Sequence, residues 1–516
     1  MDYNHFWMAR EMGSQRQVGY TLRADSNKLC PMGTTPLIII PMHIKSFIPL
    51  FTATMLFAVA CSSPTPKPFG PVPTEAQIAW QRMEINMFCH FGPNTFTGAE
   101  WGTGNEAEEV FAPTALDCRQ WVNVARQAGM GGIILTAKHH DGFCLWPSAY
   151  SNHTVTQSTW NEGHGDVLRE FVTACREGGI KAGVYISPWD RNHPAYGTEE
   201  YNSIFANTLR EVHAQYGPFF EQWFDGACGE GPNGKKQHYD WPHFMQTMHE
   251  LNPKTVIFSD IGPGCRWVGN EEGRTGDPCW STLNTEGATP SDNKPQPSEL
   301  ETGHKGGTSW VPAEVDVSIR PGWFWHADEH PKTVDELMEI YYNSVGRNGL
   351  LLLNVPPDTL GRIYTEDSAV LVAFRAERDR IFSHDLAQGA NVKGQHLFGQ
   401  KYKAANVLDS AYNSYWAAID TCASVTITFD SAEEVNLIML QEYIPLGQRV
   451  TGVSLLCDTQ GRGTYDHRID NLCTTIGYKR IIRLDEPLRC HSLIITFNAL
   501  APPIINRIAL YNTQAQ

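Results

Sequence analysis

Polar side chains close a series of apolar runs in the first half of this 516-residue sequence. Apolar runs of this length form buried parallel strands, and the carboxyl ends of such strands lie at one edge of the sheet. The side chains at these positions are His90, His139, His140, Asp141, Tyr185, Trp189, Asp225 and Asp260. Because carboxylates and imidazoles carry out acid–base and nucleophilic chemistry, the pattern predicts one reactive site at that edge.

Asp225 is the strongest candidate for the reacting group. It follows the apolar residues of Phe220–Gly226 (FEQWFDG), and the glycine after it leaves room for a ligand. An ionised carboxylate here, with a protonated carboxyl roughly 5–5.5 Å away, would match the acid pair of a retaining glycosidase. Taken alone, the position fits equally well an aspartate that caps a helix or a turn.

The elements that position these side chains alternate between apolar strands and amphipathic helices. Strands are predicted over 87–92, 132–140, 181–189, 219–226, 255–260, 314–320 and 350–355, and helices over 116–128, 166–177, 198–216 and 241–252. This alternation indicates an α/β fold of the (β/α)8-like TIM barrel type. A doubly wound sheet is the alternative, but no Gly-x-Gly-x-x-Gly fingerprint follows the first strand.

Composition limits the partners and cofactors. The formal net charge of −16 argues against binding to nucleic acid, which needs a basic surface. The 13 cysteines include no CxxC pair and no zinc-ligand spacing. A metal site at His139 and His140 is the alternative, but adjacent strand residues point to opposite faces. The sequence therefore predicts neither a metal nor a cofactor.

Four segments carry a resemblance to a known family. His90-Phe91-Gly92, Glu100-Trp101, Ala137–Phe143 (AKHHDGF) and Trp223–Gly226 (WFDG) resemble, in that order, the α-L-fucosidases of glycoside hydrolase family 29, over roughly Phe69 to Phe382. The resemblance implies that Asp225 is the nucleophile of a retaining exo-fucosidase. It also implies that the fucose pocket is formed by His90, Glu100, Trp101, His139, His140 and Tyr185. Such a set offers the hydrogen-bonding groups and the apolar wall that a 6-deoxy sugar requires.

The general acid/base is predicted from a second match. Gly262–Glu271 (GPGCRWVGNE) is similar to a loop after the fifth strand in one branch of that family. The resemblance implies that Glu271 is the acid/base, with its neighbour Glu272 as the second choice, while both remain open to interpretation as surface acids. Arg266 would steady a carboxylate or a sugar hydroxyl, and either Trp323 or Trp325 would cover the sugar ring. That branch is associated with α-1,3 and α-1,4 linkages, so the implied partners are fucosylated oligosaccharides or glycoproteins of the Lewis type.

The barrel is expected to span residues 74–382, followed by a domain of short alternating strands over 383–516. This second domain resembles a discoidin-like jelly-roll sandwich, which would bind sugar or serve as a scaffold. A disulfide among Cys422, Cys457, Cys473 and Cys490 remains open. Two other functions also remain open: a surface lipoprotein that binds fucosylated glycans without cleaving them, and a hydrolase for a related sugar or linkage.

The N-terminal region is interpreted as a targeting signal. Residues 42–61 (MHIKSFIPLFTATMLFAVAC) have the layout of a secretory signal that ends in a lipoprotein cleavage box, with Cys61 as the lipidated residue. Residues 1–41 are interpreted as an over-called start, and 62–73 as a Pro/Ser-rich tether. The expected location is the periplasm or the cell surface, with membrane contact only through the lipid anchor.

Overall fold

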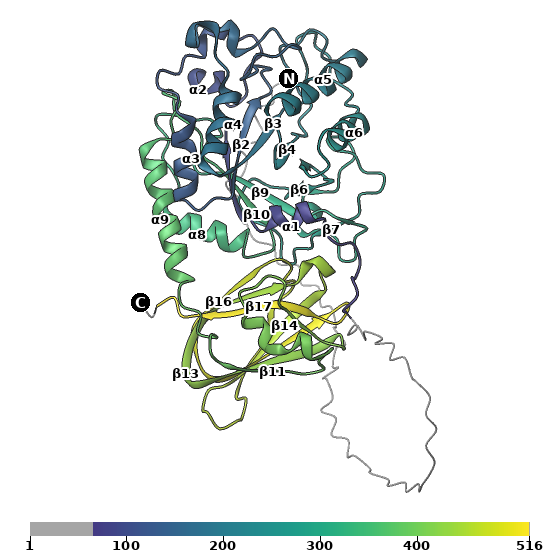
Figure 1. Ribbon diagram of the computed structural model, residues 1–516, viewed down its shortest axis with the longest axis vertical. Helices are drawn as coiled ribbons and strands as arrows, with labels where there is room; N and C mark the ends of the chain where they lie inside the picture. The colour runs from purple at the N-terminus through teal and green to yellow at the C-terminus, as the bar shows by residue number, and fades with distance from the viewer. Residues whose placement is uncertain (1–64, 515–516) are drawn as a thin grey trace, which may run out of the picture. The chain divides into compact units, whose positions relative to one another are not determined.

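A computed structural model describes residues 65–514. Eight parallel strands close into a barrel in the order β1-β2-β3-β4-β5-β6-β9-β10 (Figure 1). Their bounds are β1 Ile85–Cys89, β2 Gly132–Lys138, β3 Lys181–Ile186, β4 Glu221–Trp223, β5 Val256–Ser259, β6 Cys265–Trp267, β9 Ala313–Ser318 and β10 Leu350–Asn354. The TIM-barrel prediction is confirmed.

Helices surround the barrel, and their first residues are fixed by polar caps. The Asp117, Asp166 and Asp240 side chains accept N–H groups of the first turns of α3, α4 and α6, which lowers the cost of starting each helix. The helices are α1 Glu75–Gln81, α2 Pro93–Thr97, α3 Cys118–Gln127, α4 Val167–Gly178, α5 Glu199–Tyr216, α6 Trp241–Leu251, α7 Pro297–Thr302, α8 Val334–Asn343 and α9 Thr365–Ile381. Their apolar faces and the outward side chains of the strands form one continuous core.

The sixth barrel strand differs from the sequence prediction, which treated 262–273 as a loop. Cys265–Trp267 forms β6, pairing with β5 on one side and with β9 on the other. Only Asp260 to Gly264 separate β5 from β6, so no helix marks the new strand. A strand of three residues is too short to show the apolar periodicity on which such predictions rest.

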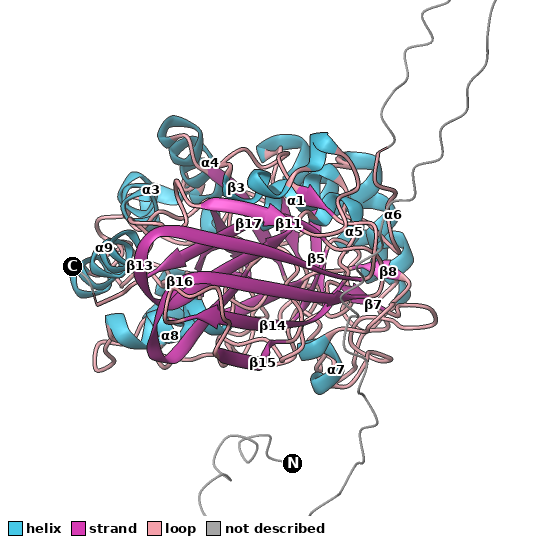
Figure 2. Cartoon of the chain, turned by 90° about the horizontal axis from the view of Figure 1, so that it is seen from below, coloured by secondary structure: helices cyan, strands magenta, loops and turns pink. Residues whose placement is uncertain are grey.

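The C-terminal domain is an antiparallel sheet in the order β12-β17-β13-β16-β14-β15, with β11 paired to β13 (Figure 2). Its strands are β11 Asn391–Gly394, β12 Trp416–Ala417, β13 Cys422–Glu442, β14 Val450–Asp458, β15 His467–Cys473, β16 Arg480–Ala499 and β17 Ile504–Tyr511. The sequence predicts only short strands here, but β13 and β16 are long, with register shifts along their shared ladder. Cys457, Cys473 and Cys490 are buried free thiols.

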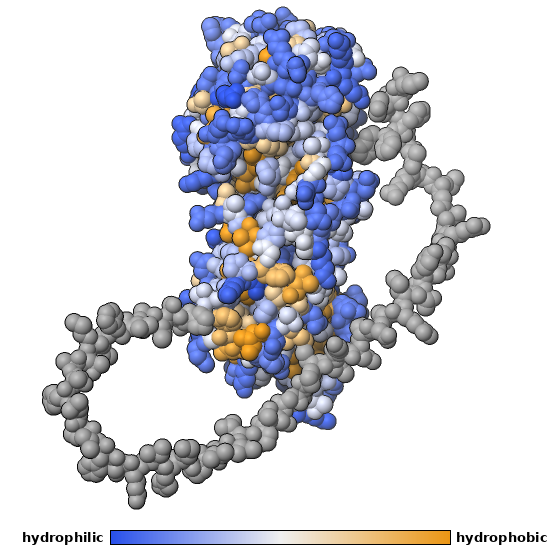
Figure 3. Space-filling model, turned by 90° about the vertical axis from the view of Figure 1, so that its right-hand side faces the viewer, coloured by the Kyte–Doolittle hydropathy of each residue, from blue (hydrophilic) through white to orange (hydrophobic). Residues whose placement is uncertain are grey.

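Ion pairs and hydrogen bonds join this domain to the barrel. Lys479 pairs with Glu84 directly before β1, and Arg480 pairs with Asp277 at 2.6 Å. Part of the predicted tether is also held, because the Arg449 guanidinium donates to the Lys67 carbonyl and the Phe69 N–H donates to the Leu446 carbonyl. On the face shown in Figure 3, the upper half of the folded region is largely hydrophilic, and apolar surface gathers lower down.

A short antiparallel pair, β7 Thr282–Leu283 and β8 Ser309–Trp310, lies in the long connection between β6 and β9. No helix within residues 65–514 is long and apolar enough to cross a membrane. The signal segment, the cleavage box and Cys61 lie outside the described residues.

Candidate active site

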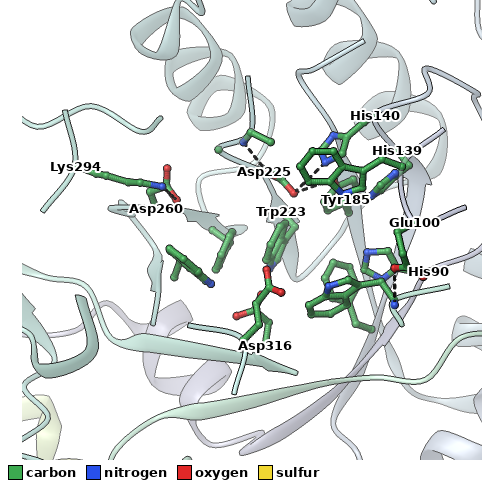
Figure 4. Close-up of a pocket in the computed structure, with 18 residues that line it drawn as sticks. His90, Glu100, His139, His140, Tyr185, Trp223, Asp225, Asp260, Lys294 and Asp316 are labelled. Atoms are coloured by element: carbon green, nitrogen blue, oxygen red, sulfur yellow. Dashed lines mark hydrogen bonds and ion pairs between the residues drawn. The ribbon is translucent and has the colours of Figure 1, made fainter. Parts of the chain in front are cut away.

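A cavity of about 280 Å³ opens at the carboxyl ends of the barrel strands (Figure 4). Most of the site residues predicted from the sequence line this cavity. The lining comprises Phe88, His90, Glu100, Trp101, His139, His140, Tyr185, Trp223, Asp225, Gly226, Ala227, Phe258, Asp260, Trp267, Glu271, Lys294, Asp316 and Trp323. These side chains come from segments far apart in the sequence, as the barrel geometry requires.

Asp225 follows β4, and donors fix both of its carboxylate oxygens. The Tyr185 hydroxyl donates to Oδ2 at 3.1 Å, and the Ala227 N–H donates to Oδ1 at 2.7 Å. His140 Nε2 lies 3.7 Å from Oδ2. A Cβ at Gly226 would lie 2.2 Å from the Asp260 carboxylate, which explains why glycine follows Asp225. The side chain is 27% exposed, so Asp225 is held in place and still open to the cavity.

Glu271 and its neighbour Glu272 occupy different surroundings. Glu271 lines the mouth of the cavity, where Trp323 hydrogen-bonds its carboxyl group. Loss of surrounding water, and secondly the negative charge of Asp225, raise the pKa of Glu271. Glu272 is outside the cavity and pairs with Arg274 at 2.8 Å. Of the two glutamates, Glu271 is therefore the one placed to exchange a proton with a bound molecule.

Three buried histidines face the cavity with neutral rings. Burial lowers the pKa of His90 to about 3 and that of His140 to about 4, and the pKa of His139 also falls well below its usual value. His90 Nδ1 lies 2.9 Å from the Asn354 Oδ1, and His140 Nδ1 lies 2.8 Å from the Ser187 hydroxyl. Neutral imidazoles oriented in this way offer hydrogen bonds to a polar ligand without adding charge.

Glu100 and Trp101 also line the cavity, Glu100 beside Trp323 and Trp101 beside His140. The Glu100 carboxylate accepts the Trp323 N–H at 2.8 Å and contacts His326 Nε2 at 2.7 Å. Trp101 is 55% exposed, with its ring 5.5 Å from that of Trp189. An exposed indole at the mouth of a polar cavity suits stacking against a sugar face.

The structure separates the two candidate tryptophans and corrects the prediction for Arg266. Trp323 lines the cavity, with its ring 5.1 Å from that of His90, whereas Trp325 lies outside it against Tyr364. Arg266 does not reach the cavity either. Its fully buried guanidinium donates to the carbonyls of Leu300, Val311 and Trp280. The cause is strand alternation in β6: Cys265 and Trp267 point into the barrel, so Arg266 between them points out.

Sequence reasoning also missed several lining residues, chiefly Trp267, Lys294 and Asp316. Lys294 pairs with Asp260 at 3.0 Å and lies over the Trp267 ring. Asp316 is 3% exposed, and its Oδ1 is buried without a hydrogen-bond partner. Burial, and secondly the charge of Glu271, raise the pKa of Asp316 well above its usual value. Asp316 lies near the carboxyl end of β9 (AEVDVS), and this strand-end position is the signal that would have identified it.

Comparisons with known proteins agree on one family. The family model described as Alpha-L-fucosidase matches residues 72–375. Alpha-L-fucosidase 1 of Arabidopsis thaliana is 41% identical over 480 residues, which are 91% of this chain and 94% of that protein.

Solved structures share the fold over most of this chain. A putative alpha-L-fucosidase from Bacteroides thetaiotaomicron is 38% identical with a TM-score of 0.80, covering 87% of this chain and 99% of that one. A Ruminococcus gnavus family 29 fucosidase solved in complex with fucose is 30% identical with a TM-score of 0.80, covering 88% of this chain and 97% of that one.

Proposed function

This chain belongs to the α-L-fucosidase family, glycoside hydrolase family 29, and from that premise we propose that it releases terminal L-fucose by a double displacement. Asp225 is the nucleophile and Glu271 is the acid and base. The observation that carries the proposal is the shared cavity: a carboxylate with both oxygens held by donors faces it, as does a carboxyl whose pKa is raised.

The two carboxyl groups act in sequence. Glu271 protonates the glycosidic oxygen while an oxygen of Asp225 attacks the anomeric carbon of fucose, so the glycosidic bond breaks and a fucosyl ester forms. Glu271, now ionised, then takes a proton from water. That water attacks the same carbon, the ester bond breaks, and Asp225 leaves as a carboxylate. The Tyr185 hydroxyl and the Ala227 N–H stabilise that carboxylate at the start and end of the cycle.

The stereochemistry of the first product tests this mechanism. Two displacements retain configuration, so proton NMR at early times should show α-L-fucose before mutarotation produces the β-anomer. A first product of β-configuration would mean a single displacement, and Glu271 would then activate water or another group would do so. Release of no fucose from any α-fucoside would instead favour a protein that only binds glycans.

We propose further that the substrates are α-1,3- and α-1,4-linked fucosides on branched glycans. In Figure 4 the cavity continues past Asp225 to Asp260 and Lys294, on the side away from His90 and Glu100. An ion pair and an indole on that side suit the hydroxyls and ring face of further sugars. The segment 262–273 contributes both Trp267 and Glu271, so the acid/base and this wall are built together.

For the C-terminal domain we propose a discoidin-like scaffold that supports the barrel. The ion pairs of Lys479 and Arg480 with barrel residues support this role. For the N-terminus we propose export, cleavage after Ala60 and lipidation of Cys61. Mass spectrometry of the mature N-terminus from the native host tests that proposal, and an unmodified N-terminus or a retained 42–60 segment would contradict it.

A further inference from the structure

Two glutamates lie in the barrel interior next to the cavity residues, where the proposed mechanism gives them no task. Glu221 of β4 and Glu314 of β9 are both fully buried. Candidate ligand atoms of Glu221, Glu314 and Cys265 all lie within 4.8 Å of one another. The Trp80 indole donates to Glu221 Oε2 at 2.8 Å, and the Trp223 indole donates to Glu314 Oε2 at 2.9 Å.

No cation in the described part of the chain pairs with either carboxyl group. The facing titratable groups are the Cys265 thiol, which donates to Glu221 Oε1 at 3.5 Å, and Asp316 on β9. Arg266 points away from the barrel interior. Main-chain carbonyls outside the barrel accept hydrogen bonds from its guanidinium. Two ionised carboxylates this close, both fully buried and without a paired cation among the described residues, would repel each other strongly.

We propose that Glu221 and Glu314 share one proton, and that the resulting pair is a positioning device for Trp223 and, through it, for the face of the cavity that carries Asp225. Glu314 Oε1 is buried and has no other partner, and a proton between the two carboxyl groups supplies one. The electrostatics point the same way. Burial raises the pKa of Glu221 to about 7, and burial together with the charge of Glu221 raises that of Glu314 well above its usual value.

The path from the pair to the reacting group is short. Glu314 accepts the hydrogen bond that fixes the Trp223 indole. The indole stacks on the Phe258 ring, with 3.7 Å between ring centroids and an interplanar angle of 6°. Trp223 also contacts Tyr185, whose ring centroid lies 5.3 Å from that of Trp223. The Tyr185 hydroxyl in turn donates to Asp225. Trp223 also lines the cavity. This step rests on the proposed function only in naming Asp225 as the nucleophile, since the shared proton is measured through stability.

Two substitutions at one position separate the shared proton from plain packing. In Glu314→Gln, the amide oxygen still accepts the Trp223 indole and the amide N–H replaces the shared proton toward Glu221. We expect kcat/KM within about threefold of the wild type. In Glu314→Leu, the indole loses its acceptor, and kcat/KM of the folded protein should fall by about tenfold or more. Rescue by glutamine of what leucine loses is the result expected of a positioning pair.

The pH dependence of stability is the second readout. A carboxyl whose folded pKa is raised keeps its proton while the unfolded chain ionises, so stability falls as pH rises from the unfolded pKa toward the folded one. Glu314→Gln removes one such group. The decrease in Tm between about pH 5 and pH 8 should therefore be smaller in this variant than in the wild type. This measurement needs no activity and holds even where the leucine variant does not fold.

A buried acid elsewhere provides the matched control. Burial raises the pKa of Glu442 in the C-terminal domain to about 7 as well, but its oxygens accept backbone N–H groups of Arg449, Val450 and Gly477. Glu442→Gln should lower Tm and leave kcat/KM of the folded protein unchanged.

Three results would overturn the proposal. The first is a Tm profile of Glu314→Gln that falls with pH as steeply as the wild type. The second is Glu314→Gln as inactive as Glu314→Leu, together with a stoichiometric metal in the wild-type protein by elemental analysis, which would replace the proton with a cation. The third is a folded, fully active Glu314→Leu.

Discussion

Two strands of the barrel each bring two acids to its interior, and the members of each pair have opposite surroundings. On β4 and just beyond it, Glu221 is sealed inside the barrel and Asp225 opens to the cavity. On β9, Glu314 is sealed and Asp316, two residues later, lines the cavity. The sealed acids accept indole N–H groups, whereas Asp225 is held by a phenol and a main-chain N–H. An acid on the inward face is thus open to a ligand or confined to a structural contact according to whether the cavity reaches it.

The largest effect should come from the open acid of β4. Asp225→Asn keeps the size of the side chain and its contact with Tyr185 but removes the proposed nucleophile. We expect kcat on 4-nitrophenyl α-L-fucoside to fall at least about 10³-fold, or about 4 kcal/mol of barrier. Circular dichroism should show an unchanged fold. Near-normal turnover in a folded variant would remove Asp225 from the mechanism.

The next effect concerns the acid across the cavity. Glu271→Ala removes the proposed proton donor and base, so turnover should fall about 10²–10⁴-fold. Azide needs no base to attack the fucosyl ester. It should therefore restore turnover and yield a fucosyl azide, identified by mass spectrometry.

Glu272→Ala is the matched control for that variant, because Glu272 pairs with Arg274 outside the cavity. Its activity should be close to that of the wild type. Azide rescue of Glu272→Ala in place of Glu271→Ala would exchange the two assignments.

A smaller effect on kcat/KM is expected from a change of substrate. If the wall formed by Asp260, Lys294 and Trp267 contacts a branching sugar, contacts remote from the broken bond lower the barrier as well as aid binding. kcat/KM on Lewis a or Lewis x trisaccharides should exceed that on 4-nitrophenyl fucoside or α-1,2-fucosyllactose by about 10²-fold, near 3 kcal/mol. Equal or faster cleavage of the α-1,2 linkage would refute the linkage proposal and leave the fucosidase assignment intact.

Much of this arrangement was visible in the sequence because strand ends carry the chemistry. Asp225, His90 and Tyr185 each follow or end an apolar run, and all three line the cavity. The sequence could not show in which direction side chains point within short strands and turns. Arg266 sits in a match to the family loop, yet the alternation of a three-residue strand turns it outward. Trp323 and Trp325 are two residues apart in a turn without periodicity, so only the folded chain separates them.

The sealed acids escaped prediction for a related reason. Glu221 and Glu314 each lie in a short strand that contains a polar residue. A polar residue in a strand usually indicates an exposed face. In a closed barrel the inward face has no solvent, so the same alternation buries the acids. A local pattern cannot state which face is closed, because closure depends on all eight strands.

The smallest expected effect comes from substitution of Asp316, which shares features of the sealed acids and of the acids that line the cavity. Its buried Oδ1 has no partner, it lines the cavity, and burial with the charge of Glu271 keeps its pKa well above the usual value. The raised pKa favours the uncharged form of Asp316, which Asp316→Asn resembles in charge while keeping one oxygen. We expect kcat/KM on 4-nitrophenyl fucoside to fall by about tenfold or less, the size of one hydrogen bond to the bound sugar. The amide does not titrate, so a loss that grows with rising pH would show that the ionised form of Asp316 contributes to activity. No loss at all would place Asp316 with the sealed acids, and a loss near that of Asp225→Asn would show that Asp316 works as a carboxylate in the reaction itself.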